Sequence, residues 1–249
     1  MIYGLYHSAA GMMTSEYRQN VIANNLANAE TVGFKQELTL FAERLPAREA
    51  GVRNGPSDPG MAGLSGGLWL GRTCTDYSQS SLLATGYPTD LALEGPGFLV
   101  VEVAGQPQYT RDGRFVMAAD GQLRAVSDGA PALDVTGRPI WLNPHGGAPQ
   151  FDEDGRVLQD GLARGRLALV DFEDYEALRK VGASRFEAGD APTTGSAARV
   201  LSGHLESSGV EPVRELVSML ETTRAHEVNA RMLGMQDQSL SRLISVIGR

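Results

Sequence analysis

The stretch that most constrains the fold is residues 21–35, with the sequence VIANNLANAETVGFK. It begins with apolar residues at helical spacing, but three asparagines follow within five residues. Asparagine side chains compete for the backbone hydrogen bonds of a helix interior, so a helix that starts near the N-terminus is expected to end here. An ordinary helix end is the more common explanation of such a pattern. Three closely spaced amides are, however, more typical of a surface that binds a partner.

Two amphipathic segments predict long helices near the two ends of the chain. Residues 3–28 have apolar positions at i, i+3 and i+4, and the segment that starts near Pro212 carries a longer apolar series. The spacing of that series drifts between three and four, as in a coiled coil. Isolated helices of this quality are marginal in water, so they are expected to pair with each other and with other subunits. The series comprises Val213, Leu216, Val217, Leu220, Val228, Met232, Met235, Leu243, Ile244 and Ile247.

The centre of the chain has the pattern of short antiparallel strands. Asp-Gly pairs at 112–113, 120–121, 128–129, 154–155 and 160–161 are typical of tight hairpin turns. The predicted class is α+β, with long terminal helices in a coiled-coil-like domain and a central antiparallel barrel or sandwich. The expected division is an N-terminal helix in 1–40, a Gly/Pro-rich linker in 41–71, the β-rich domain in 72–209 and a C-terminal helix in 210–249.

Composition excludes several functional classes. The net charge is −8, which disfavours nucleic acid and anionic membrane surfaces as partners. Most of this charge lies in the middle of the chain, and nearly neutral ends suit packing against copies of themselves. No apolar run approaches the ~18 residues of a membrane span, and no cleavable signal peptide is expected. Cys74 is the only cysteine, so no intramolecular disulfide is possible.

Candidate catalytic and metal motifs are weak. Residues 63–67 match G-x-S-x-G, but a Pro/Gly-rich segment precedes Ser65 where a nucleophile elbow needs a strand. Residues 152–155 hint at a calcium loop, although the glycine comes too early and a hairpin turn explains them better. The four histidines have no zinc-ligand spacing. We therefore expect no catalytic residue, no metal site and no cofactor, and a serine hydrolase using Ser65 is the rival from another functional class.

Three blocks of sequence resemble one family. The residues 8–12 and 21–35 closely resemble the N-terminal motif of the bacterial flagellar rod and hook proteins. Residues 90–98 and 109–115 resemble the central segment of that family, and Arg224, Glu227 and Asn229 resemble its C-terminal Arg-x-x-Glu-x-Asn motif. Departures are Ser80 for a usual glycine, Leu99 for an aromatic residue and Gly209 for an asparagine.

The resemblance implies a structural axial component of the flagellar basal-body rod. Such a protein self-assembles through its terminal helices into a drive shaft that transmits torque and encloses the export channel. The implied partners are copies of itself, other rod proteins, the hook and the flagellar export apparatus, and the implied location is the periplasmic rod. The length favours a proximal-rod (FlgF-type) member, with the distal-rod (FlgG-type) next. A free-standing adhesin-like β domain is a further rival, which would not need the helices.

The residues expected to form the assembly interface come from both terminal segments. They are Leu5, Ala9, Met12, Ile22, Asn24, Asn25, Leu26, Asn28, Thr31, Gly33, Phe34, Val217, Leu220, Arg224, Glu227, Asn229 and Leu243.

Overall fold

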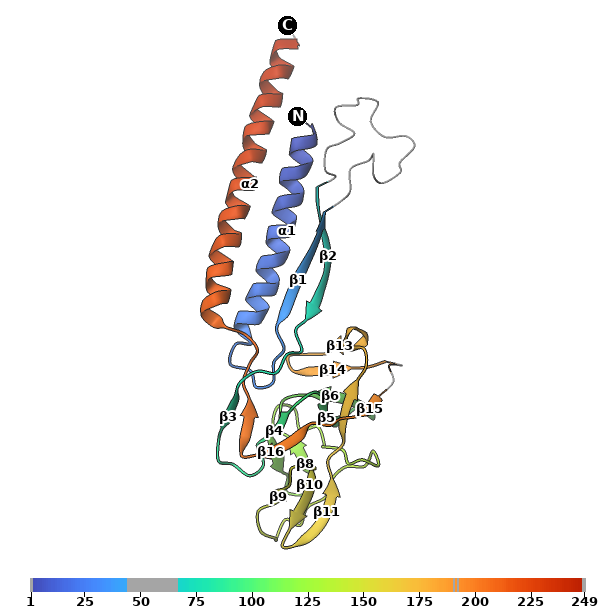
Figure 1. Ribbon diagram of the computed structural model, residues 1–249. Coiled ribbons are helices and arrows are strands. Elements are labelled where there is room, and N and C mark those ends of the chain that lie inside the picture. The colour runs from blue at the N-terminus through green and yellow to red at the C-terminus, as the bar shows by residue number, and fades with distance from the viewer. Residues whose placement is uncertain (1, 44–66, 190, 192, 248–249) are drawn as a thin grey trace. The chain divides into compact units, whose positions relative to one another are not determined.

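The computed structural model describes residues 2–43, 67–189, 191 and 193–247 (Figure 1). Contacts divide the chain into two units. Unit 1 takes its described residues from Met1–Ala27, Glu37–Thr75 and Pro212–Arg249, and unit 2 takes them from Asn28–Gln36 and Asp76–Glu211. The predicted α+β class is confirmed in this form, with two long helices in the first unit and a β-rich second unit. The proposed linker 41–71 lies mostly outside the described residues.

Unit 1 consists of two helices and a hairpin. Helix α1 (Ile2–Ala27) and helix α2 (Pro212–Ile247) lie side by side and antiparallel (Figure 1). Strands β1 (Glu37–Glu43) and β2 (Leu68–Thr75) pair antiparallel, with a register shift after Thr39. Both predicted helices are confirmed, and α1 ends among the asparagines as expected. The hairpin was not predicted, because its strands lie at the two edges of the Gly/Pro-rich segment.

Unit 2 is built from short antiparallel strands and one 3-10 turn, η1 (Tyr175–Ala177). Its largest sheet has six strands in the order β13–β14–β6–β5–β12–β15 and curls as an open half-barrel. The strands are β3 (Leu82–Ala84), β4 (Leu91–Glu94), β5 (Phe98–Val103), β6 (Gln106–Thr110), β7 (Phe115–Met117), β8 (Leu123–Ala125), β9 (Gln150–Phe151), β10 (Arg156–Gln159), β11 (Leu162–Arg166), β12 (Leu169–Phe172), β13 (Arg179–Lys180), β14 (Arg185–Glu187), β15 (Thr193–Gly195), β16 (Arg199–Ser202) and β17 (His204–Glu206).

The Asp-Gly pairs at 120–121, 128–129, 154–155 and 160–161 lie in turns, as the sequence predicts, whereas the pair at 112–113 lies in an extended segment between β6 and β7, which do not pair with each other. Asp160 and Gly161 both have positive φ and join β10 to β11, which is the geometry of a two-residue hairpin turn. Residues 152–155 form the turn between β9 and β10, where the Asp152 carboxylate accepts a hydrogen bond from the Arg156 amide. The calcium-like sequence is therefore a hairpin turn.

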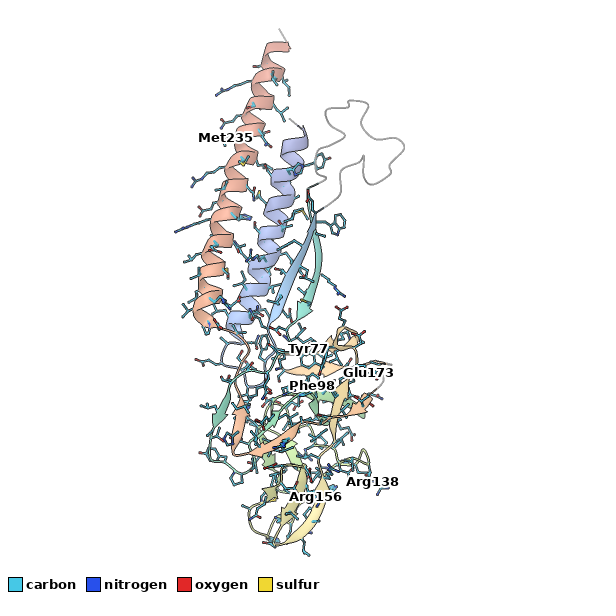
Figure 2. The ribbon with its side chains drawn as sticks, in the orientation of Figure 1. Tyr77, Phe98, Arg138, Arg156, Glu173 and Met235 are labelled. Atoms are coloured by element: carbon cyan, nitrogen blue, oxygen red, sulfur yellow. The ribbon has the colours of Figure 1, made fainter. Side chains whose placement is uncertain are left out.

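Two apolar clusters form the core of unit 2. One is aliphatic and includes Leu91, Leu123 and Val157, and the other is aromatic, with Phe98 and Phe186 at its centre. Figure 2 shows Tyr77 beside Phe98, with ring centroids 6.1 Å apart in an edge-on arrangement. These side chains are buried within the unit, so its core does not depend on a partner.

Candidate assembly interface

The contact between α1 and α2 is formed largely by small and polar residues. A Cβ on Gly4 would lie 2.7 Å from the Gln236 side chain, and one on Gly11 would lie 2.7 Å from the Asn229 side chain. The contacts recur every seven residues on both helices. The glycines thus leave room for amide side chains of the opposite helix, which explains why Gly11 is tolerated inside α1.

The buried positions of α2 confirm this polar character. Among its described side chains, only Glu215 and Thr222 are fully buried, and both belong to the same seven-residue series as Asn229 and Gln236. The Thr222 hydroxyl donates to the Ser218 carbonyl at 2.7 Å, so it needs no partner on α1. The expectation that the helices pair along an apolar seam is thereby corrected. The apolar series of α2 lies elsewhere.

That apolar series forms an exposed face of α2, which we call the α2 stripe. Val213 is 77% exposed and Leu220 is 61% exposed. The part of the stripe from Val213 to Leu220 lies opposite the residues that face α1, because positions 213, 217 and 220 fall on the other side of a 3.6-residue helix from 215, 222 and 229. Figure 2 labels Met235, one of its members. The stripe comprises Val213, Leu216, Val217, Leu220, Val228, Met232 and Met235, and the exposed residues Leu243 and Ile244 lie farther along α2.

Asn25 has an intramolecular role at the end of α1. Its side chain is buried, and its Nδ2 donates to the Glu37 carbonyl at 2.8 Å while its Oδ1 accepts from the Glu37 amide at 3.0 Å. One amide thus satisfies both backbone groups at the start of β1. This pair ties α1 to the hairpin and leaves Asn25 no exposed surface for a neighbour.

The segment that follows α1 is part of unit 2. Gly33 has a φ of +66°, and a Cβ there would lie 2.4 Å from the Arg111 backbone, so only glycine fits. Phe34 is fully buried, and the Lys180 ammonium lies 3.8 Å from the centre of its ring. Both predicted interface residues are therefore buried inside unit 2, and we call the segment Asn28–Gln36 that follows α1 the anchor segment.

Next to Phe34 lies a buried cluster of charged side chains. The sequence analysis did not predict it. Lys35 Nζ donates to Glu206 Oε1 at 2.7 Å and to the Ser78 carbonyl at 2.7 Å. Arg111 donates to the other Glu206 oxygen at 3.1 Å. Burial lowers the pKa of Lys35 from its ordinary value, and the Glu206 carboxylate opposes that shift. The sequence signal that could have indicated this cluster is that the chain has only two lysines, Lys35 and Lys180. In the structure both lie next to Phe34.

The remaining predicted interface residues are spread over unit 1 and the segment after α1. Val217, Leu220, Arg224, Glu227 and Leu243 are exposed on α2, and Asn229 faces α1. Ile22 is buried and Asn24 is exposed. The partly buried ones are Leu5, Ala9, Met12, Leu26, Asn28 and Thr31.

A groove of about 580 Å³ lies in unit 1 between α1 and the start of β2. We call it the α1 groove. It is lined mainly by apolar surface from Ala10, Met13, Tyr17 and Trp69, with Glu16 and Asn20 among its polar residues. Trp69 is 62% exposed, which is unusual for so large an apolar side chain. Trp69 was not among the predicted interface residues.

Other classes of site find little support in the described part of the chain. No group of three or more His, Cys, Asp or Glu suited to a metal occurs among residues 2–43, 67–189, 191 and 193–247. Neither α1 nor α2 is apolar enough over its described length to cross a membrane. Ser65 of the G-x-S-x-G match lies outside the described residues.

Comparisons with known protein families find matches in the two terminal segments of the chain. Residues 5–35 match the family model "Flagella basal body rod protein", and residues 201–246 match "Flagellar basal body rod FlgEFG protein C-terminal". The flagellar basal-body rod protein FlgF of Caulobacter vibrioides is 34% identical, over 92% of this chain and 91% of its own length. The chain belongs to the flagellar basal-body rod protein family.

Members of two types in this family resemble the chain over nearly its whole length. FlgG of Buchnera aphidicola (subspecies Schizaphis graminum) is 30% identical over 98% of this chain and 99% of its own. FlgG of Bacillus subtilis is 28% identical over 99% of both. The chain is therefore a rod protein of FlgF or FlgG type, and the family resemblance read from the sequence is confirmed. The two family models cover α1 with its anchor segment and α2 with the strands before it.

Proposed function

We propose that this chain is a structural component of the flagellar basal-body rod that self-assembles through unit 1. The observation that carries the proposal is the α2 stripe, a long apolar face that no described residue of unit 1 covers. Exposed apolar surface of this extent is typical of protein interfaces. In the assembled shaft the stripe is buried against neighbouring subunits.

The proposed role is mechanical and not enzymatic. Subunits joined by many modest apolar contacts share a load, and the methionines of the stripe adapt to neighbours of slightly different shape. We infer that unit 1 forms a coiled-coil-like assembly domain around the export channel, and that unit 2 is a separate β-rich domain. Torque passes from subunit to subunit through the helices.

The decisive variant is Leu220→Asp. A carboxylate buried without a partner costs on the order of several kcal/mol, so this variant is expected to abolish recovery of the chain in purified basal bodies and to abolish swimming. The matched control is Leu162→Asp in unit 2. Leu162 is also 61% exposed, but it lies on β11, so its replacement is expected to leave assembly intact.

The outcomes can be compared when both variants fold, which circular dichroism of the purified chains checks. Loss of assembly only in Leu220→Asp supports the proposal. Normal rods and normal motility with Leu220→Asp would contradict the assignment of the stripe to assembly.

The position along the rod and the partners are part of the same proposal. We infer a proximal-rod position with other rod proteins as axial neighbours and with export through the flagellar export apparatus. Photo-crosslinking from Leu220 in intact basal bodies identifies the neighbours by mass spectrometry. Crosslinks to proteins of the distal rod or hook alone would place the chain at the distal end instead.

A further inference from the structure

We infer that the α1 groove of one copy receives the α2 stripe of a second copy, near Leu220 and Arg224. This inference rests on the proposed self-assembly and specifies which two surfaces meet. The two surfaces are complementary in kind, since one is a concave apolar groove and the other is a convex apolar ridge. Both belong to unit 1, so every copy supplies one of each.

Two charged side chains, one in the groove and one on α2, indicate which portion of the α2 stripe fits the α1 groove. Glu16 is the charged residue that lines the α1 groove, and it forms no ion pair with any described residue. Arg224 is exposed, likewise has no ion pair with the described residues, and follows Leu220 by one helical turn on the same face. Placing Leu220 among Met13, Tyr17 and Trp69 brings an arginine to a carboxylate at the edge of an apolar contact, where such pairs are favourable.

The α1 groove and the dense part of the α2 stripe have similar lengths. The groove residues Ala10 to Asn20 span ten residues of α1, or about 15 Å along the helix axis. The dense part of the stripe from Val213 to Arg224 spans eleven residues, or roughly 16 Å. Each surface is therefore about three helical turns long.

The directions of the two surfaces determine the type of assembly. The stripe residues Val217 and Leu220 face away from α1. The groove residues Met13 and Tyr17 lie on a different side of α1 from its glycines Gly4 and Gly11, which face α2. A contact between two different surfaces is heterologous, and it repeats indefinitely unless the rotation closes a ring. One groove-to-stripe contact thus adds subunits in one direction, as a shaft requires.

Disulfide crosslinking in basal bodies tests the inference. In a Cys74→Ser background, Met13→Cys or Asn20→Cys is combined with Leu220→Cys, because the two groove positions lie on either side of Glu16 and cover both helix directions. Each chain then carries one cysteine on each surface. Oxidation of at least one of these double variants is expected to give a ladder of covalent oligomers, whereas each single variant gives none.

The control pair is Met13→Cys with Ile244→Cys. Ile244 is exposed on α2 but lies 24 residues, or about 36 Å, beyond Leu220, so no ladder is expected. A ladder from the control pair and not from the test pairs would overturn the assigned register. A faster-migrating monomer without oligomers would also overturn the inference, because the groove would then be occupied by the same chain.

A charge exchange gives an independent readout. Glu16→Arg and Arg224→Glu are each expected to lower the yield of the crosslinked ladder by about threefold or more, and the double variant is expected to restore it. No restoration would argue against this pairing of charges. The cysteine variants could be recovered in basal bodies under reducing conditions and still give no ladder on oxidation. That result would reject the inference but leave the proposed function standing. Absence of the wild-type chain from basal bodies would reject the proposed function itself.

Discussion

Unit 2 keeps its large apolar side chains inside, whereas unit 1 displays many of its own on α2. In unit 2, Phe98, Phe186 and Val157 are buried by neighbours from the same unit. In unit 1, α2 buries only Glu215 and Thr222 among its described side chains, and it exposes Val213 and Leu220. The difference indicates that unit 2 is stabilised by its own core, while unit 1 reaches its full apolar burial only with other subunits.

The largest expected effect breaks the core of unit 2. Phe186→Ala removes a fully buried ring from the aromatic cluster, so the free energy of unfolding is expected to fall by about 3–5 kcal/mol. Leu220→Ala is the matched change in unit 1, where an exposed side chain contributes within about 0.5 kcal/mol in the monomer. Urea unfolding of the full monomeric chain, followed by circular dichroism, measures both. Equal losses would contradict the comparison.

The buried charges of unit 2 provide the next test. Glu206→Gln leaves Lys35 and Arg111 without their shared counter-charge, which is expected to cost about 3 kcal/mol. The control Glu187→Gln removes the partner of Arg179 in an exposed pair, and its expected cost is below about 1 kcal/mol. The same urea titration decides between them. A neutral effect of Glu206→Gln would show that the cluster does not hold the anchor segment in place.

A smaller effect is expected at the end of α1. Asn25→Ala leaves both backbone groups of Glu37 without their side-chain partner, so the loss is expected to be about 2 kcal/mol. It should appear as faster hydrogen exchange of the Glu37 amide. The control is Asn20→Ala, an exposed position on the same helix, which is expected to leave that exchange unchanged. Unchanged exchange in both would assign Asn25 a role outside the monomer.

The sequence predicted the features that depend on local pattern. The Asp-Gly turns and the end of α1 follow from the conformational preferences of glycine and asparagine, and the stripe follows from helical periodicity. The sequence also identified Val217 and Leu220 as interface candidates. What it could not supply was the direction in which the stripe points, because an amphipathic pattern does not say whether its apolar face packs inside the chain or against another copy.

The features that were missed depend on contacts between distant residues. The hairpin of β1 and β2 joins residues on either side of a long Gly/Pro-rich segment, so no local turn pattern marks it. Nothing near Lys35 in the sequence shows that it is buried, because its partner Glu206 is 171 positions away. Asn25 and Phe34 looked available to a partner because nothing local shows that Glu37 and Lys180 occupy them.

The smallest expected effect concerns a polar contact within the aromatic cluster of unit 2. Tyr175 stacks on Tyr77 and its hydroxyl donates to Asp171 at 2.5 Å. Burial, aided by the Asp171 carboxylate, raises the pKa of Tyr175 to about 12. The folded chain therefore keeps a proton that the unfolded chain loses near pH 10, its ordinary pKa. This contribution to stability is fully present below pH 10 and is lost as the pH rises towards 12.

Tyr175→Phe is accordingly expected to lower the free energy of unfolding by about 1 kcal/mol at pH 8, because one hydrogen bond is lost. Its stability should then fall less steeply than that of the wild type between pH 10 and 12, because the group that titrates there is gone. Melting temperatures at pH 8 and pH 11 measure the difference, with Tyr87→Phe, an exposed tyrosine of the same unit, as the control. Parallel pH profiles for wild type and Tyr175→Phe would mean that the Tyr175 proton does not contribute to the stability of unit 2. The difference between the buried core of unit 2 and the exposed face of α2 would then depend on apolar burial alone.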